Sequence, residues 1–269
     1  MNSCSSIRFA VLAAGEGSRL AEEGIIVPKP LVQLGGTPLL DRLLRLFAEY
    51  EPQEILVITN ERVNEQLRLL PQAVPYRLVV KNTPSSMHSF YELMPLLGQG
   101  PFVLTTVDTV FRPEEFNAYV NAFLRALQDD EECAGLMGVT AFVDDEKPLW
   151  VSTDSTLRIT GFHDSQEQFH ASGAAGECRF VSGGIYGLTH RCFPTLQRCI
   201  EGGQSRMRNF QRAMVADGLR LSAFPFTKVL DIDHASDITK AEEFLMCPGE
   251  NEITLGEFGN SPMGNPQLA

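Results

Sequence analysis

Two kinds of apolar segment alternate along the chain, and their alternation predicts the fold class. Short runs rich in β-branched residues, typical of buried strands, occupy residues 7–14, 54–59, 77–80, 101–107, 134–143, 180–188 and 219–226. Amphipathic segments with helical spacing occupy residues 37–47, 63–70, 90–97, 113–127, 192–200, 207–217 and 237–246. An alternation of strand and helix predicts an α/β fold with a doubly wound, mostly parallel sheet.

The remaining pattern predicts one small addition to this sheet and a single domain. Two short runs at residues 148–153 and 156–162 are joined through Asp154-Ser155, which predicts an antiparallel hairpin inserted on the sheet. No internal repeat or change of composition marks a linker, so we expect one domain over residues 1–246. Residues 247–269 are rich in glycine, proline and asparagine and are expected to form an irregular tail.

A turn with two glycines follows the first predicted strand. It reads GEGSR at residues 15–19, and such a turn lets backbone N–H groups approach a ligand closely. Further along, Lys29 stands between Pro28 and Pro30. A glycine turn, an arginine and a stiffly presented lysine together indicate a phosphate site. Two other phosphate motifs are excluded, because residues 20–22 read LAE where a dinucleotide fingerprint needs glycine first and a Walker A loop needs Gly-Lys-Ser/Thr.

The spacing of these residues is similar to that of a known family. LAAGEGSRL followed by PKPL resembles the signature G-x-G-x-R … P-K-P of nucleotidyltransferases that make nucleotide sugars and related activated metabolites. The resemblance implies a Rossmann-like nucleotidyltransferase fold, with Arg19 neutralising the triphosphate and Lys29 the acceptor phosphate. It also implies a loop that wraps the nucleotide, made of Leu12, Ala13, Ala14, Gly15, Glu16, Gly17, Ser18 and Arg19.

A serine-rich segment after the third predicted strand bears on the nucleotide base. NTPSSM at residues 82–87 resembles the N-x-x-S-S-M/L stretch of cytidylyltransferases that activate phosphocholine. The resemblance implies that Asn82, Ser86 and Ser89 lie beside the base. Capping of the following helix by Ser85 or Ser86 is the alternative role. Sugar nucleotidyltransferases usually have a G-T-A type sequence here, so the base and the acceptor both stay open.

Three aspartates are candidate ligands of a metal ion. Asp108 follows a buried strand, at the edge where open α/β sheets bind their ligands. A carboxylate there suits Mg²⁺, which binds through one or two carboxylates plus substrate phosphates. The family resemblance implies Asp108 as the first ligand and either Asp231 or Asp233 as the second, and the sequence does not choose between them. Helix or loop capping by Asp108, and a structural role for the C-terminal acidic cluster, are the alternatives.

A pair of glycines in the strand at residues 180–188 is a candidate acceptor contact. The segment SGGIY, which contains Gly183 and Gly184, resembles the N-A-G-I-Y segment that lines the sugar site of the family. Paired glycines would let an acceptor approach the backbone. A glycine bulge in a core strand is the alternative.

Charge and composition exclude several classes of partner. The net charge of the 269 residues is −12, so nucleic acid and anionic membranes are unfavourable partners for the molecule as a whole. No stretch approaches the roughly 18 apolar residues of a membrane span. Residues 1–6 lack the basic and apolar regions of a signal peptide, and the six cysteines form no C-x-x-C pair. We therefore expect a cytoplasmic protein with reduced thiols.

The family resemblance carried by these motifs implies an enzyme, a nucleotidyltransferase. In the expected reaction an acceptor phosphate attacks the α-phosphorus of an NTP with the help of Mg²⁺, and pyrophosphate leaves. Arg19, Lys29 and Asp108 would act by positioning and charge neutralisation. A sugar 1-phosphate is the leading expectation for the acceptor, followed by phosphocholine or a similar phospho-alcohol. A non-catalytic nucleotide-binding regulatory subunit is the alternative from another class, and the sequence is silent on oligomeric state.

Overall fold

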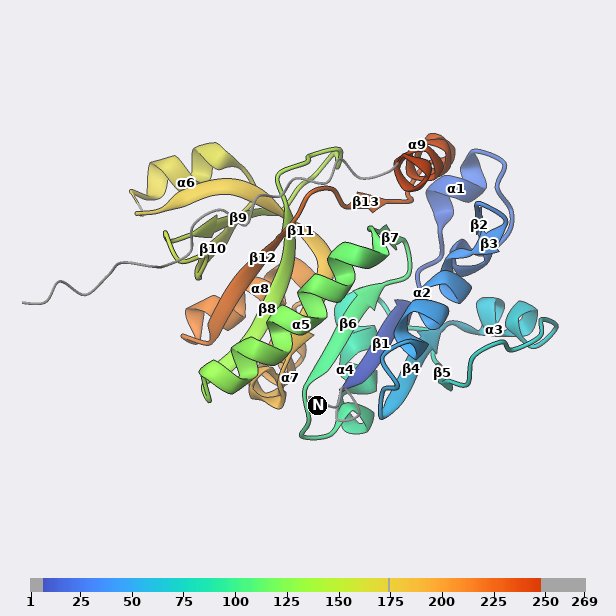
Figure 1. Ribbon diagram of the computed structural model, residues 1–269, viewed down its shortest axis with the longest axis horizontal. Coiled ribbons are helices and arrows are strands. Elements are labelled where there is room, and N and C mark those ends of the chain that lie inside the picture. The colour runs from blue at the N-terminus through green and yellow to red at the C-terminus, as the bar shows by residue number, and fades with distance from the viewer. Residues whose placement is uncertain (1–6, 174, 248–269) are drawn as a thin grey trace, which may run out of the picture.

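The computed structural model describes residues 7–173 and 175–247 of the chain (Figure 1). The predicted irregular tail lies outside the described residues except for Cys247, and residues 1–6 lie outside them as well. Within the described part, none of the helices has the length and apolar composition needed to cross a membrane. A single domain over residues 1–246 stays a prediction.

Strands and helices alternate from the N-terminus onward. The strands are β1 (Arg8–Ala13), β2 (Gln33–Leu34), β3 (Thr37–Pro38), β4 (Glu54–Thr59), β5 (Arg77–Val80), β6 (Phe102–Thr106), β7 (Thr109–Val110), β8 (Cys133–Thr140), β9 (Trp150–Thr153), β10 (Ile159–His163), β11 (Glu177–Leu188), β12 (Arg220–Phe226) and β13 (Leu230–Asp231). The α-helices are α1 (Ser18–Glu22), α2 (Leu39–Ala48), α3 (Glu61–Leu67), α4 (Ser86–Leu97), α5 (Pro113–Asp129), α6 (Gln166–Ser172), α7 (Phe193–Glu201), α8 (Met207–Ala216) and α9 (Ala235–Met246). Short 3-10 helices are η2 (Lys29–Leu31) and η3 (His190–Cys192).

Nine of the described strands form the central sheet. Its order is β10-β9-β11-β6-β1-β4-β5, with β8 paired to β11 and β12 paired to β8. The strands β6, β1, β4 and β5 run parallel, as the alternation of strand and helix predicts. The long strand β11 runs antiparallel to β6, β8 and β9, and the β9–β10 hairpin is the predicted antiparallel addition. The α/β fold class is thereby confirmed.

Side chains alternate along β1 and build two hydrophobic cores, one on each face of the sheet. Phe9 and Val11 pack on the face covered by α2, α5 and α9, whereas Ala10 and Leu12 pack on the face covered by α4, α7 and α8 (Figure 1). Because β1 carries apolar side chains on both of its faces, it is buried between two layers of helices. Helices on both faces are what the term doubly wound describes.

The structure differs from the sequence prediction mainly where helices begin. Thr37 and Pro38 form strand β3 instead of the first turn of a helix, because Gly35 and Gly36 adopt φ of 58° and 77° and close a two-residue hairpin between β2 and β3. Helix α4 begins at Ser86, earlier than predicted, and Ser85 accepts the capping hydrogen bond from the His88 N–H. The alternative role for Ser85, a helix cap, is therefore confirmed.

An aromatic cluster between β1 and α5 gives the first testable prediction. Phe116 is fully buried, and its ring centroid lies 4.8 Å from that of Phe111 and 5.6 Å from that of Phe47. Truncation to alanine removes these contacts and leaves a cavity, so Phe116→Ala should lower the free energy of unfolding by about 3–5 kcal/mol. Urea denaturation measures the loss. Leu69→Ala is the control, because Leu69 is 83% exposed and should change stability by at most about 0.5 kcal/mol. A similar small loss in both variants would contradict this core.

Candidate functional site

The glycine turn after β1 packs directly against the segment that carries the lysine. Gly17 adopts φ of 64° and precedes α1, and a Cβ placed on it would lie 3.2 Å from the Cβ of Lys29. Glycine is therefore favoured here by both its conformation and this close approach. Pro30 follows Lys29 in the 3-10 helix η2 and is buried, which fixes the backbone that presents the lysine. The two parts of the N-terminal motif thus form one structural unit.

A second backbone contact brings the C-terminal acidic segment to the carboxyl end of β6. Strand β7 pairs antiparallel with β13, so that Asp231 lies opposite Thr109. The Ile232 N–H also donates to the Asp108 carbonyl over 3.1 Å. Asp108 and the segment around residue 231 are distant in the sequence but adjacent in space. The sequence prediction that these aspartates share one site is consistent with this geometry.

Four of the predicted residues form a compact group that we call the ion cluster, consisting of Arg19, Lys29, Asp108 and Asp233. Lys29 Nζ lies 2.6 Å from Asp108 Oδ2 and 2.6 Å from Asp233 Oδ1. Arg19 Nη1 lies 2.9 Å from Asp233 Oδ2. The lysine side chain is only 11% exposed, whereas that of Arg19 is half exposed. Lys29 is therefore the central cation of the cluster and Arg19 its outer member.

The charges in the ion cluster support one another. Burial alone would lower the pKa of Lys29, but the adjacent carboxylates of Asp108 and Asp233 outweigh burial and raise it. Burial alone would raise the pKa of Asp108, but Lys29 and a hydrogen bond from Thr106 hold it below its ordinary value. Both groups are consequently charged at neutral pH.

Asp231 is the carboxylate without a cation of its own. It receives a hydrogen bond from Thr109 Oγ1 over 3.2 Å, and no ion pair involves it within the described residues. Asp231 is exposed at the wall of a pocket, but partial desolvation by the surrounding protein, together with the charges of Asp108 and Asp233, raises the pKa of Asp231 to about 8. The excess of negative charge at this point is the structural feature that an added cation would relieve.

A pocket on one side of the ion cluster, which we call the loop pocket, encloses about 620 Å³. Its lining is formed by Leu12, Ala14, Gly15, Glu16, Gly17, Lys29, Thr83, Pro84, Ser85, Ser86, Ser89, Thr106, Val107 and Asp108. Most of the residues predicted to bind nucleotide lie here. Ala13 does not, because it points into the core, and neither do Ser18, Arg19 and Asn82. The Asn82 side chain instead accepts a hydrogen bond from the Glu61 N–H over 3.3 Å.

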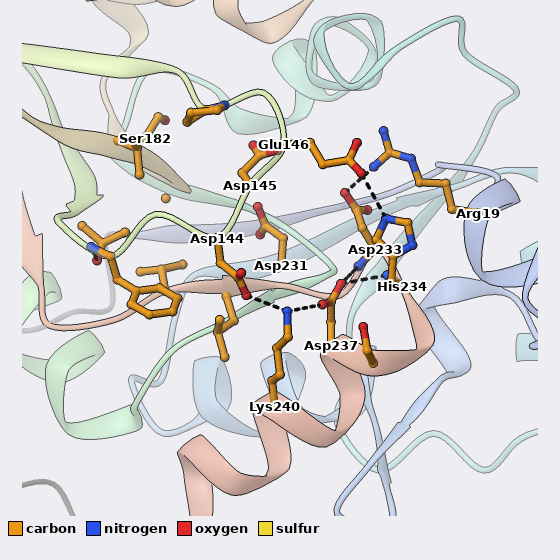
Figure 2. Close-up of a pocket in the computed structure, with 18 residues that line it drawn as sticks. Arg19, Asp144, Asp145, Glu146, Ser182, Asp231, Asp233, His234, Asp237 and Lys240 are labelled. Carbon is orange, nitrogen blue, oxygen red and sulfur yellow. Dashed lines mark hydrogen bonds and ion pairs between the residues drawn. The ribbon is translucent and has the colours of Figure 1, made fainter. Parts of the chain in front are cut away.

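A second pocket, which we call the acidic pocket, lies on the other side of the ion cluster and encloses about 250 Å³ (Figure 2). It is lined by six carboxylates, those of Asp144, Asp145, Glu146, Asp231, Asp233 and Asp237. Its cations are Arg19 and Lys240, and Lys240 is bound by Asp144 and Asp237 at 2.9 and 3.2 Å. The acidic residues 144–146 are not among the site residues predicted from the sequence, although three consecutive acidic residues after a buried strand indicate a possible site.

The two adjacent glycines of β11, Gly183 and Gly184, differ in whether they line a pocket. Gly183 lines the acidic pocket and Gly184 does not. The pairing of β11 with β8 shifts register between Ser182 and Ile185, so the glycines form a bulge. Gly184 adopts φ of 71°, and a Cβ there would lie 2.7 Å from Thr109 Oγ1. The alternative of a glycine bulge is thus confirmed, and Gly184 serves the packing of Thr109.

One contact that the sequence did not reveal fixes α1 to the start of α9. Glu23 accepts hydrogen bonds from His234 Nδ1 and from the Ala235 N–H, each over 2.6 Å. These bonds lower the pKa of Glu23, the Ala235 N–H contributing most. Because α1 carries Arg19 and His234 follows Asp233, the contact holds the outer ion pair of the cluster together.

The donor set fits a hard divalent cation. Among the described residues, no group of three or more His, Cys, Asp or Glu side chains is already arranged to hold a metal ion. Mg²⁺ needs fewer protein ligands, since it keeps waters and substrate phosphates around one or two carboxylates. Asp108 and Asp231 lie close enough to raise the pKa of Asp231, and they are oxygen donors of the required kind.

The raised pKa of Asp231 predicts an unusual dependence of stability on pH. In the unfolded chain Asp231 titrates near pH ~3.9, but in the folded chain it keeps its proton until about pH 8. Between these values the folded chain binds the extra proton, so stability falls as the pH rises. The free energy of unfolding of Asp231→Asn, measured by thermal unfolding with EDTA, should equal that of wild type near pH 4. Above pH 8 it should exceed that of wild type by about 1 kcal/mol, a value reduced for solvent screening.

Asp237→Asn is the control of opposite sign. The N–H groups of Asp233 and His234 donate to Asp237 and, together with Lys240, lower its pKa against the effect of burial. Its contribution to stability is present above the unfolded pKa and is lost as the pH falls through the folded pKa. Asp237→Asn should therefore be less stable than wild type at neutral pH. The same change in the free energy of unfolding in Asp231→Asn and Asp237→Asn would contradict the opposite pKa shifts assigned to these two carboxyl groups.

Comparison with known proteins places the chain in a family. A 2-aminoethylphosphonate cytidylyltransferase from Lancefieldella rimae is 28% identical over 108 residues, which are 39% of this chain and 44% of that protein. The chain spans less than half of the length of the first curated relatives it matches.

Solved structures with the same fold include two that cover almost the whole chain. The inositol-1-phosphate CTP transferase from T. maritima superposes with a TM-score of 0.67 at 18% identity, covering 90% of this chain and 99% of that one. The phosphocholine cytidylyltransferase from Streptococcus pneumoniae gives 0.68 at 17% identity, covering 89% and 99%. The model of the MobA-like NTP transferase domain matches residues 9–216. The chain therefore belongs to the MobA-like NTP transferase domain family.

Proposed function

We propose that the chain is a nucleotidyltransferase that joins an NTP to a phosphorylated or phosphonylated small molecule and releases pyrophosphate. The observation that carries the proposal is the position of Lys29, which lines the loop pocket and whose Nζ lies between Asp108 and Asp233, the latter a residue of the acidic pocket. The buried Lys29 thus faces the loop pocket, and Arg19, which pairs with the same Asp233, faces the acidic pocket. An acceptor oxygen would attack the α-phosphorus, and the bond from the α-phosphorus to the bridging oxygen of pyrophosphate would break.

In this proposal the NTP occupies the loop pocket. The backbone N–H groups of residues 15–17 face the phosphates, and Ser86 and Ser89 lie toward the base. Arg19 is half exposed and can turn from Asp233 toward the β- and γ-phosphates. Lys29 then compensates the charge that develops at the α-phosphate. No side-chain nucleophile is required, so catalysis depends on positioning and charge compensation.

Mg²⁺ is the proposed metal, held by Asp108 together with Asp231 or Asp233. When bound, it would orient the α-phosphate and offset its charge. Of the two candidates for the second ligand, we favour Asp231, because Asp233 is already paired with both Lys29 and Arg19. Asp231 has no ion-pair partner among the described residues and carries the raised pKa that a bound cation would reverse.

The charge of the acidic pocket favours an acceptor with a cationic group. Six carboxylates line it against Arg19 and Lys240, and Lys240 is already bound by Asp144 and Asp237. A neutral sugar gains little from such a field, whereas an ammonium group is attracted by it. One relative is named for 2-aminoethylphosphonate and one structural neighbour for phosphocholine, and both of these molecules carry a cationic nitrogen. We therefore rank an amino- or ammonium-bearing acceptor above the sugar 1-phosphate that the sequence favoured.

Release of pyrophosphate tests the proposal. Each of the four NTPs would be mixed with Mg²⁺ and one acceptor from a panel of phosphocholine, phosphoethanolamine, 2-aminoethylphosphonate and sugar 1-phosphates. We expect release that requires one NTP and one cationic acceptor together. Asp108→Asn is the matched control and should lose at least about 100-fold in kcat, because it removes a charged ligand of the Mg²⁺ that would offset the charge of the reacting phosphates. Release at the wild-type rate by Asp108→Asn would contradict the metal assignment. Binding of an NTP without release from any pair would favour the non-catalytic alternative.

Recognition of a cationic acceptor predicts a selective effect of Asp145. Asp145 lines the acidic pocket and contributes to the field at Asp231, and within the described residues it has no ion pair. Asp145→Asn should raise KM for the cationic acceptor about 3- to 10-fold, equivalent to roughly 0.7–1.4 kcal/mol, and leave KM for the NTP unchanged. Steady-state kinetics measure both constants. Asp129→Asn, at the far end of α5, is the control for net charge. An equal change in the two variants would rule out a local role for Asp145.

A further inference from the structure

Two threonines on either side of Asp108 form a hydrogen-bonded pair. Thr106 Oγ1 and Thr109 Oγ1 lie 2.6 Å apart, and Thr109 Oγ1 donates to Asp231 Oδ1 over 3.2 Å. The Thr106 hydroxyl also lies near Asp108 and contributes to the lowered pKa of that carboxyl group. The two hydroxyls therefore connect the carboxylates of Asp108 and Asp231 through a continuous chain of polar contacts.

The surroundings of this hydroxyl pair are shaped to hold it in place. Thr109 is only 2% exposed, and its backbone is fixed opposite Asp231 by the pairing of β7 with β13. A Cβ on Gly184 would lie 2.7 Å from Thr109 Oγ1 and 3.1 Å from Thr106 Oγ1. Glycine in the β11 bulge thus leaves the space that the two hydroxyls occupy. The freedom of the Thr109 side chain to move away from Asp231 is correspondingly small.

Thr105 supplies the contrast. It precedes Thr106 on the same strand and is fully buried, but its hydroxyl has no hydrogen-bond partner among the residues that the structure describes. Burial of a threonine hydroxyl in β6 is therefore not by itself evidence of a role in the site. Valine in place of Thr105 would fill the same space without loss of a hydrogen bond. The hydroxyl of Thr109 differs because it bonds to two groups of the site.

We propose that Thr106 and Thr109 are positioning residues that hold the carboxylates of Asp108 and Asp231 at the separation needed to share one divalent cation. The proposal rests on the proposed function, because that function assigns these carboxylates to the cation. Without the Thr109 hydroxyl, the carboxyl group of Asp231 is retained but loses the contact that fixes its orientation. Outer groups of this kind typically change metal affinity about 10- to 100-fold.

Binding of Mn²⁺ tests this proposal without turnover. Mn²⁺ alone would be titrated into the full chain, and the free ion measured by electron paramagnetic resonance, for wild type, Thr109→Val, Thr109→Ser and Thr105→Val. Thr109→Val should weaken Mn²⁺ binding at least about 10-fold. Thr109→Ser retains the hydroxyl and should stay within about twofold of wild type, as should Thr105→Val, which removes a hydroxyl without a partner.

The outcomes separate this inference from the proposed function. Equal affinity of Thr109→Val and Thr105→Val for Mn²⁺ would overturn the inference even if wild type releases pyrophosphate. Absence of Mn²⁺ binding by wild type would overturn it together with the metal assignment. A wild type that binds Mn²⁺ but releases no pyrophosphate would refute only the activity, and the comparison of variants would still decide the role of Thr109. Thermal unfolding checks that each variant is folded, and Thr106→Val replaces Thr109→Val if the latter is not.

Discussion

The buried ammonium of Lys29 is the interaction on which the site depends. It lies at 2.6 Å from carboxylates of Asp108 and Asp233, which belong to different parts of the chain, the end of β6 and the segment after β13. Removing one partner from a buried pair leaves an uncompensated charge, so the three groups must be placed together. The fold achieves this with backbone contacts: Gly17 against Lys29 on one side, and β7 paired with β13 on the other.

This charge arrangement also explains why the two pockets lie where they do. The carboxyl ends of β1 and β6 meet at one edge of the sheet, so the glycine turn and Asp108 form a continuous wall of the loop pocket. The bulge in β11 and the segment after β13 form the opposite wall, which belongs to the acidic pocket. The ion cluster separates the two cavities and is in contact with both, which suits a reaction between two anions.

Local sequence predicted those parts of the site that depend on short-range geometry. Gly17, Lys29 and Asp108 are recognisable because a turn, a proline-flanked cation and a strand end are defined by their neighbours in the chain. The acidic pocket could not be predicted in the same way, since its walls come from residues 144–146, β11 and α9. Likewise the antiparallel direction of β11 is seen in its pairing with β6 and cannot be read from its own apolar pattern, and the hydroxyls of Thr105 and Thr109 differ only in their three-dimensional partners.

The same negative charge that holds Lys29 in place also limits what can bind. Phosphate oxygens approaching the ion cluster compete with Asp108 and Asp233 for a lysine and an arginine that are already paired. A divalent cation shared by Asp108 and Asp231 would reduce this competition, because it adds positive charge where Asp231 has none. An acceptor with its own cationic nitrogen would lower the repulsion further, with its phosphate toward Lys29 and its nitrogen toward the carboxylates of the acidic pocket. With a net charge of −12, the protein would accommodate anionic substrates at this cluster when Arg19, Lys29 and a bound divalent cation together offset the carboxylates around them.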